Sequence, residues 1–90
     1  MRTLPDELGT RDIQVLRFIV SFHKDLGISP TYREIQRHFN LSSTEQVLRC
    51  TQRLRALGFL SSNPRLKGRS RNLIPTALAD RYLRRHDEDE

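Results

Sequence analysis

The sequence has little from which a disulfide framework, a metal site or a membrane span can be built. It contains one cysteine, Cys50, and no tryptophan, so no disulfide can form within the chain and no cysteine-rich metal site is expected. The three histidines lie on different segments, without the H-x-x-x-H spacing of helical zinc sites. No apolar run approaches the roughly 18–20 residues that a bilayer-spanning helix needs. The segment MRTLPDELGT has no apolar stretch typical of a signal peptide, so we expect a cytoplasmic protein with no membrane partner.

Groups that commonly catalyse reactions are also sparse. The glycines form no phosphate-binding loop. Ser42 and Ser43 stand where helix caps are expected. Cys50 falls on the apolar side of a helix, where a buried thiol is usually inert. These patterns predict neither an enzyme nor a cofactor.

Positive charge is what the sequence has in abundance. The 90 residues are enough for one domain. Lys and Arg number 16 against 11 Asp and Glu, which gives a net charge of +5 and a pI near 10.3. Residues 33–71 carry nine basic side chains and two acidic ones. Most of the basic residues are arginine, which suits bidentate contact with phosphate and guanine, so we expect a nucleic-acid partner.

A long first helix is predicted from Thr10, as its N-cap, to Leu26, with Gly27 as the C-terminal stop. Its apolar residues form two neighbouring stripes, so we expect it to be covered on two sides. The first stripe is Val15, Phe18, Ile19, Phe22 and Leu26. The second stripe is Ile13, Leu16 and Val20.

Two further helices follow in close succession. Thr31 and Glu34 fit a capping box, and Ile35 and Phe39 supply the buried side of a short second helix. Ser42–Glu45 and Ser43–Gln46 both fit a second capping box. It opens a third helix that ends near Leu57, before Gly58. The helical spacing predicts these buried positions on the third helix: Val47, Cys50, Thr51, Leu54 and Leu57.

A β-hairpin with a basic tip is predicted next, from strands at 59–62 and 72–74. Pro75 and Thr76 then begin a fourth helix that ends near residue 86, and residues 87–90 are expected to be a disordered acidic tail. The predicted fold is mainly α with a small β-hairpin. It is a winged helix-turn-helix of three core helices plus a C-terminal helix, with residues 1–75 as the DNA-binding domain.

The third helix, about residues 43–57, is predicted to read DNA in the major groove, because its side opposite the core is polar and basic. The wing, residues 63–71, is predicted to meet the backbone or the minor groove. Candidate base contacts are Ser43, Thr44, Glu45, Gln46 and Arg49. Candidate backbone contacts are Thr31, Arg33, Arg53, Arg65, Lys67, Arg69 and Arg71.

The chain resembles the DNA-binding domain of the LexA repressor family over about residues 8–74. The most specific stretch is Pro30-Thr31-Tyr32-Arg33-Glu34-Ile35, which matches the family's P-T-x-R-E-I. Further matching residues are Thr10, Arg11, Val15, Ile19, Gly27, Ser43, Leu54 and Gly58. The resemblance implies a three-helix winged domain that binds operator DNA. Among the family's base-contacting positions only Ser43 matches, so the family's operator sequence is not carried over to this chain. The family's C-terminal protease domain has no counterpart in this sequence.

Two functions therefore remain open. The first is a nucleoid-associated, sequence-specific transcriptional regulator that binds double-stranded DNA, with dimers on two half-sites. Its expected self-association surface is Ile13, Leu16, Val20, Leu78 and Tyr82. The alternative is that the fourth helix covers this stripe within one chain. The second function is a winged-helix adaptor in a larger protein complex, in which the outward Leu48 contacts a partner instead of a thymine methyl group.

Overall fold

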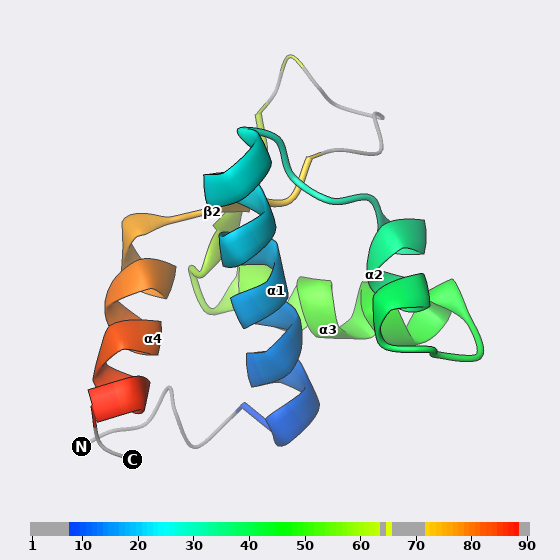
Figure 1. Ribbon diagram of the computed structural model, residues 1–90, viewed down its shortest axis with the longest axis horizontal. Coiled ribbons are helices and arrows are strands. Elements are labelled where there is room, and N and C mark those ends of the chain that lie inside the picture. Colours follow the sequence, from blue (N-terminus) through cyan, green and yellow to red (C-terminus); the bar gives the residue numbers. More distant parts are fainter. Residues whose placement is uncertain (1–7, 64, 66–71, 89–90) are drawn as a thin grey trace.

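The elements follow the order helix, helix-turn-helix, ribbon, helix (Figure 1). The structure is a computed structural model and describes residues 8–63, 65 and 72–88, with side chains through residue 85. Its elements are α1 (Thr10–Leu26), α2 (Tyr32–His38), α3 (Thr44–Ala56), β1 (Leu60–Ser61), β2 (Ile74–Pro75) and α4 (Ala77–Glu88). The predicted mainly α winged helix-turn-helix fold with a small hairpin is confirmed.

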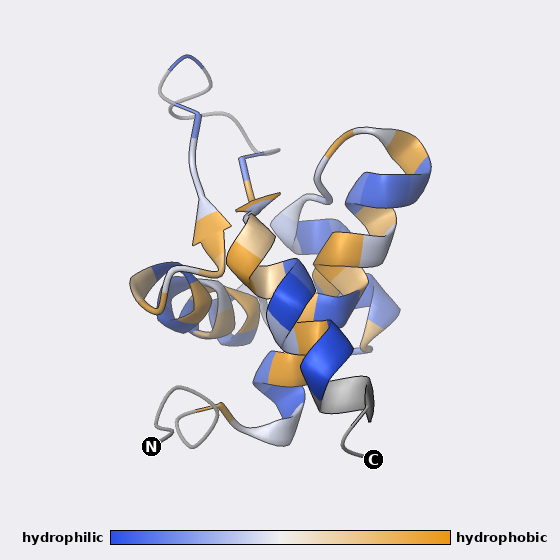
Figure 2. Ribbon diagram, turned by 90° about the vertical axis from the view of Figure 1, so that its left-hand side faces the viewer, coloured by the Kyte–Doolittle hydropathy of each residue, from blue (hydrophilic) through white to orange (hydrophobic). Residues whose placement is uncertain are grey.

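The core lies where α1 meets α3, the ribbon and α4. Figure 1 shows α1 in front of α3, with α4 and α2 on its two flanks. Hydrophobic and hydrophilic residues alternate along the helices in Figure 2, as expected for helices with one buried side. The largest fully buried side chains include Phe59, Leu16, Ile19 and Leu54. On α3 the predicted positions Val47, Cys50, Thr51 and Leu54 are buried, whereas Leu57 is half-buried.

Local capping sets where the first two helices begin. Thr31 is the N-cap of α2, and its Oγ1 accepts from the amide of Glu34 at 3.0 Å. The Glu34 carboxylate accepts from the Thr31 amide at 2.9 Å, so the predicted capping box is confirmed. On α1 the predicted cap was wrong: Thr10 is already helical, and Gly9 is the N-cap. The reason is Asp12, whose carboxylate accepts from the Gly9 amide at 3.2 Å.

The turn between α2 and α3 depends on backbone shape more than on side-chain caps. Asn40 adopts φ +54°, a left-handed conformation that asparagine tolerates better than most residues. Ser43 is the N-cap of α3, but its side chain makes no capping hydrogen bond. Neither predicted capping box therefore forms here. The carboxylate of Glu45 instead pairs with Arg49 along the same helix.

The ribbon is shorter than predicted and is fixed to the end of α3. Leu60 pairs with Pro75, and Ser61 pairs with Ile74, in antiparallel register. Gly58 supplies a φ of +89° after α3, which lets the chain turn into β1. Thr76 donates its hydroxyl to the Gly58 carbonyl at 2.7 Å, and this bond joins the two ends of the ribbon.

Helix α4 packs back on α1, which corrects the expected self-association surface. Leu16 is fully buried and Val20 is 7% exposed within one chain, where they share the core with Ala79 and Leu83 of α4. The ion pair between Lys24 and Asp80, at 3.0 Å, also joins the two helices. The other three expected surface residues, Ile13, Leu78 and Tyr82, are partly buried against the same core. The second stripe of α1 is therefore covered within the chain.

Two further expectations differ from the structure. In the first stripe of α1, Val15 and Ile19 are buried, but Leu26 is 60% exposed because the helix ends beyond the core. Helix α4 continues to Glu88, beyond the end predicted near residue 86, since no glycine or proline interrupts it after Thr76. Within the described part of the chain, no helix is both long enough and apolar enough to cross a membrane.

The two threonines at helix starts provide a matched test of capping. We expect Thr31→Ala to lower the free energy of unfolding by about 1 kcal/mol, because it removes one half of the capping box. Thr10→Ala should change it by less than about 0.5 kcal/mol, because Thr10 is exposed and Gly9 is the cap. Urea denaturation followed by circular dichroism measures both values. An equal cost for the two substitutions would contradict this assignment of the caps.

Candidate nucleic-acid interface

The exposed side of α3 collects the predicted base-contacting residues. Ser43, Thr44, Glu45, Gln46 and Arg49 are all exposed. At 100° per residue, Glu45, Arg49 and Gln52 lie in one row directly opposite the buried residues of the helix. Gln46 lies nearer the edge of this surface. Gln52 was not among the predicted base contacts, although it lies in the same exposed row as Glu45 and Arg49.

Glu45 and Arg49 form an ion pair on this surface. The Arg49 Nη2 atom lies 3.3 Å from the Glu45 carboxylate, and both side chains are about 70% exposed. An exposed pair of this kind contributes roughly 0–1 kcal/mol. Arg49 can therefore leave Glu45 for another hydrogen-bond acceptor with little loss of free energy.

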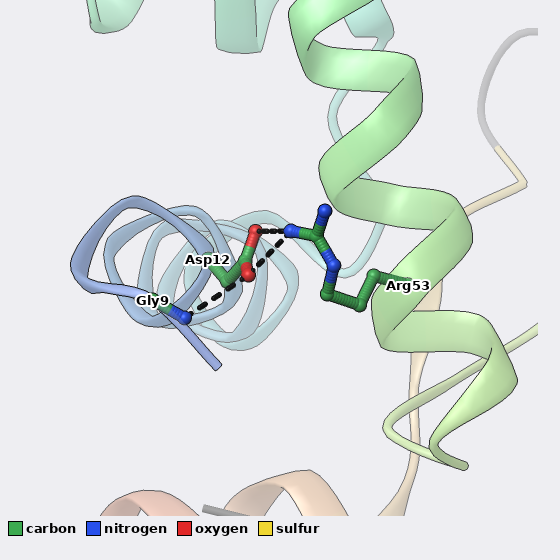
Figure 3. Close-up of polar contacts among 3 residues, drawn as sticks. All are labelled: Gly9, Asp12 and Arg53. Atoms are coloured by element: carbon green, nitrogen blue, oxygen red, sulfur yellow. Dashed lines mark hydrogen bonds and ion pairs between the residues drawn. The ribbon is translucent and has the colours of Figure 1, made fainter. Parts of the chain in front are cut away.

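Arg53 has a partner that the sequence did not indicate. Its Nη1 atom donates to both oxygens of Asp12, at 2.8 Å and 2.6 Å. Figure 3 shows the Asp12 side chain reaching from the first turn of α1 to the guanidinium on α3. Arg53 was predicted to contact the DNA backbone. The structure instead shows it linking two helices.

Cys50 lies beside this link and belongs to the same network. It is 7% exposed, and burial is the main cause that raises the pKa of its thiol to about 11. The Asp12 carboxylate adds to the rise, because it accepts a hydrogen bond from the thiol and repels a thiolate. The thiol is thus held protonated and faces the core, as the helical spacing predicted.

Arg55 is turned away from the exposed row and toward the ribbon. Its side chain is half-buried, and Nη2 donates to the Asn72 carbonyl at 3.5 Å. The Asn72 side chain in turn accepts from the Asn63 amide at 2.8 Å. Arg55 therefore helps to orient the base of the wing relative to α3.

The predicted backbone contacts fall into three groups. Arg33 and Arg65 are exposed, while Thr31 is half-buried and its hydroxyl oxygen accepts within the capping box. Arg53 is held by Asp12. Lys67, Arg69 and Arg71 lie outside the described residues.

Leu48 lies on the outer side of α3, as predicted, and is 37% exposed. Its carbonyl accepts from the buried Thr51 hydroxyl at 3.0 Å, which satisfies that hydroxyl inside the helix. The half-exposed side chain adjoins the exposed row.

Among the described residues, no cluster of three or more His, Cys, Asp or Glu side chains suits a metal ion. Sequence reasoning also missed Asp12, which joins α1 to Arg53 of α3. Its partner is 41 positions away in the chain, so no helical period or local motif indicates the pair. The one local signal was an acidic residue in the first turn of α1, where the helix dipole favours negative charge.

The chain matches known proteins over the elements that form this surface. Residues 5–72 match the family model of the LexA DNA binding domain. The LexA repressor of Anaeromyxobacter dehalogenans strain 2CP-1 is 42% identical over 76 residues, which cover 84% of this chain and 32% of the repressor. The LexA repressor of Enterococcus faecalis strain V583 is 36% identical over 78 residues, 87% of this chain and 37% of the repressor. The chain thus spans about a third of the length of the curated relatives it matches. Helix α4 begins after the part matched by the family model.

The environment of Cys50 makes its reactivity a test of whether the thiol is buried and protonated. At pH about 8 we expect a thiol reagent to modify the folded protein slowly, because the thiol is buried and its pKa is raised to about 11. The same protein unfolded in urea should react fast and is its own control. Equal rates in the two states would contradict the buried, protonated thiol.

The same shift has a consequence for stability. The folded pKa lies above the ordinary value of 9.0, so the contribution of Cys50 is complete below pH 9 and declines as the pH rises to about 11. Cys50→Ala should therefore show a smaller loss of stability over this pH range than the parent protein, in urea titrations at each pH. Parallel losses in the two proteins would count against the shift.

Proposed function

This chain belongs to the LexA DNA-binding domain family, and we propose that it is the sequence-specific DNA-binding domain of a transcriptional repressor. The observation that carries this proposal is the row of exposed polar side chains on α3, opposite the core. In the proposal α3 lies in the major groove, and residues 63–71 lie along the backbone or in the minor groove.

The chemistry of the row suits the reading of base edges. Arg49 has the fork of donors that matches guanine O6 and N7, and Glu45 can accept from cytosine N4. Gln46 and Gln52 can pair with adenine through their amides. Ser43 and Thr44, at the start of α3, have hydroxyls that either donate or accept. Helix N-terminal residues usually make the base contacts in this kind of domain.

Exposed cations beside the row provide the sequence-independent part of binding. We assign backbone contacts to Arg33, Arg65 and the wing residues Lys67, Arg69 and Arg71. Thr31 can add a hydrogen bond, because a hydroxyl that accepts can still donate its own proton. Arg53 is left out of this set, since its charge is already matched by Asp12.

A repressor of this kind acts in the cytoplasm at the nucleoid, on double-stranded DNA. One small domain covers one half-site, so two copies on adjacent half-sites are part of the proposal. The contact between the copies involves surfaces other than Leu16 and Val20, which are buried. The half-exposed Leu48 supports a second candidate, a winged-helix adaptor that contacts a protein through α3. Loss of a protein partner in Leu48→Ala, with DNA selectivity unchanged, would favour that candidate.

Selection of sequences from a random duplex library tests the proposed function. The parent protein should enrich one motif, and Arg49→Ala should lower affinity for it by about 1–3 kcal/mol and relax one position. Arg81→Ala is the matched control, because it removes the same charge from an exposed position on α4. If the parent protein enriches no motif, or if both variants lose affinity equally, base reading by Arg49 is wrong.

The wing provides a separate test by salt dependence. Replacement of Arg65, Arg69 and Arg71 by alanine should reduce the slope of log K against log salt by roughly 0.9 for each phosphate that the variant no longer binds. The selected motif should stay the same, because phosphate contacts have no sequence information. A triple alanine variant at Arg81, Arg84 and Arg85 of α4 controls for net charge. Equal slopes for the two triple variants would exclude the wing as the contact.

A further inference from the structure

Most of the contact between α3 and the rest of the protein is apolar. Val47 and Leu54 are fully buried on the inner side of the helix. Hydrophobic contacts have little directional preference. Their close packing restricts the rotation of α3 about its own axis, and a directional polar contact restricts it further.

The pair of Asp12 and Arg53 is directional and joins α3 to α1 at one point. Asp12 is 3% exposed, so its carboxylate depends on protein donors. Those donors are the Gly9 amide on α1 and the Arg53 guanidinium on α3. Figure 3 shows the carboxylate between the start of α1 and the guanidinium. A carboxylate with donors on both sides resists movement in either direction.

We propose that Asp12 and Arg53 are positioning residues, which fix the rotation of α3 and so set the sequence selectivity of the exposed row. This inference rests on the proposed function. Arg53 lies one helical turn after Arg49, so its link acts close to the reading side chains. At a radius of about 5–6 Å, a rotation of about 10° moves a side chain by roughly 1 Å. A shift of that size moves the donor and acceptor atoms of a bidentate contact with a base beyond hydrogen-bonding distance.

The competing interpretation is that Arg53 contacts a phosphate and that Asp12 only weakens this attraction. The two interpretations predict opposite effects when the negative charge of Asp12 is removed. Loss of a negative charge beside DNA should tighten all binding if only electrostatics matters. Loss of the positioning link should weaken binding to the selected motif alone.

The experiment compares Asp12→Asn with Asp80→Asn. Both substitutions raise the net charge by one and disrupt an ion pair, but Asp80 lies on α4 and pairs with Lys24 and Arg84. Dissociation constants are measured for the selected motif and for an unrelated duplex at one salt concentration. We expect Asp12→Asn to bind the motif at least about five-fold more weakly and the unrelated duplex equally or more tightly. Asp80→Asn should leave the ratio of the two constants unchanged.

An unchanged ratio in Asp12→Asn, with the parent protein selective, overturns the inference and leaves the proposed function intact. A parent protein with no selectivity overturns the proposed function, and the inference falls with it. Circular dichroism at the assay temperature checks that each variant is folded. If Asp12→Asn is unfolded, Arg53→Lys decides, because lysine keeps the charge but lacks the guanidinium fork. Arg53→Lys should bind the motif more weakly relative to the unrelated duplex, as Asp12→Asn should. If the two dissociation constants keep their ratio in Arg53→Lys, the inference is overturned.

Discussion

The buried carboxylate of Asp12 is the constraint on which the arrangement of α1 and α3 depends. A charged group that is 3% exposed loses its hydration and must be compensated by protein donors. Here the donors come from the N-cap of α1 and from Arg53 of α3. The start of one helix and the orientation of the other are thereby linked. Removal of Arg53 would leave the buried carboxylate without its charged partner, which costs more than the pair contributes when intact.

This constraint divides the arginines of α3 into three kinds. Arg53 is held by a buried carboxylate, and Arg55 is anchored to the base of the wing. Arg49 pairs with Glu45 at an exposed position, where such a pair is weak. The helix therefore offers one arginine whose partner can be exchanged at little cost. The other two hold the helix and the wing in place around it.

Local signals in the sequence predicted most of the helices and much of the core. The capping box at Thr31 and the buried row from Val47 to Leu54 follow from spacing within one helix. The errors came from long-range packing. The local sequence does not show whether Leu16 and Val20 contact another chain or lie beneath α4. Only the position of α4 in the fold decides this. The cap of α1 was misplaced for a related reason, since Asp12 serves both Gly9 beside it and Arg53 far along the chain.

The candidate site was predictable as a surface but not as a geometry. The sequence identified the exposed side of α3 from charge and period, and Glu45 and Arg49 are both exposed there. It did not reveal that the two are paired, although their spacing of four residues permits it. The pairing changes how the acidic residue is understood. A lone glutamate on a DNA-binding surface would repel phosphates. In the proposed function, the pair weakens the attraction of Arg49 to phosphates on unrelated DNA, and both groups gain new partners where guanine and cytosine are within reach. In the proposed function, Glu45 thus lowers the affinity for DNA of any sequence and raises the preference for one motif. This requires that α3 is held at a fixed rotation.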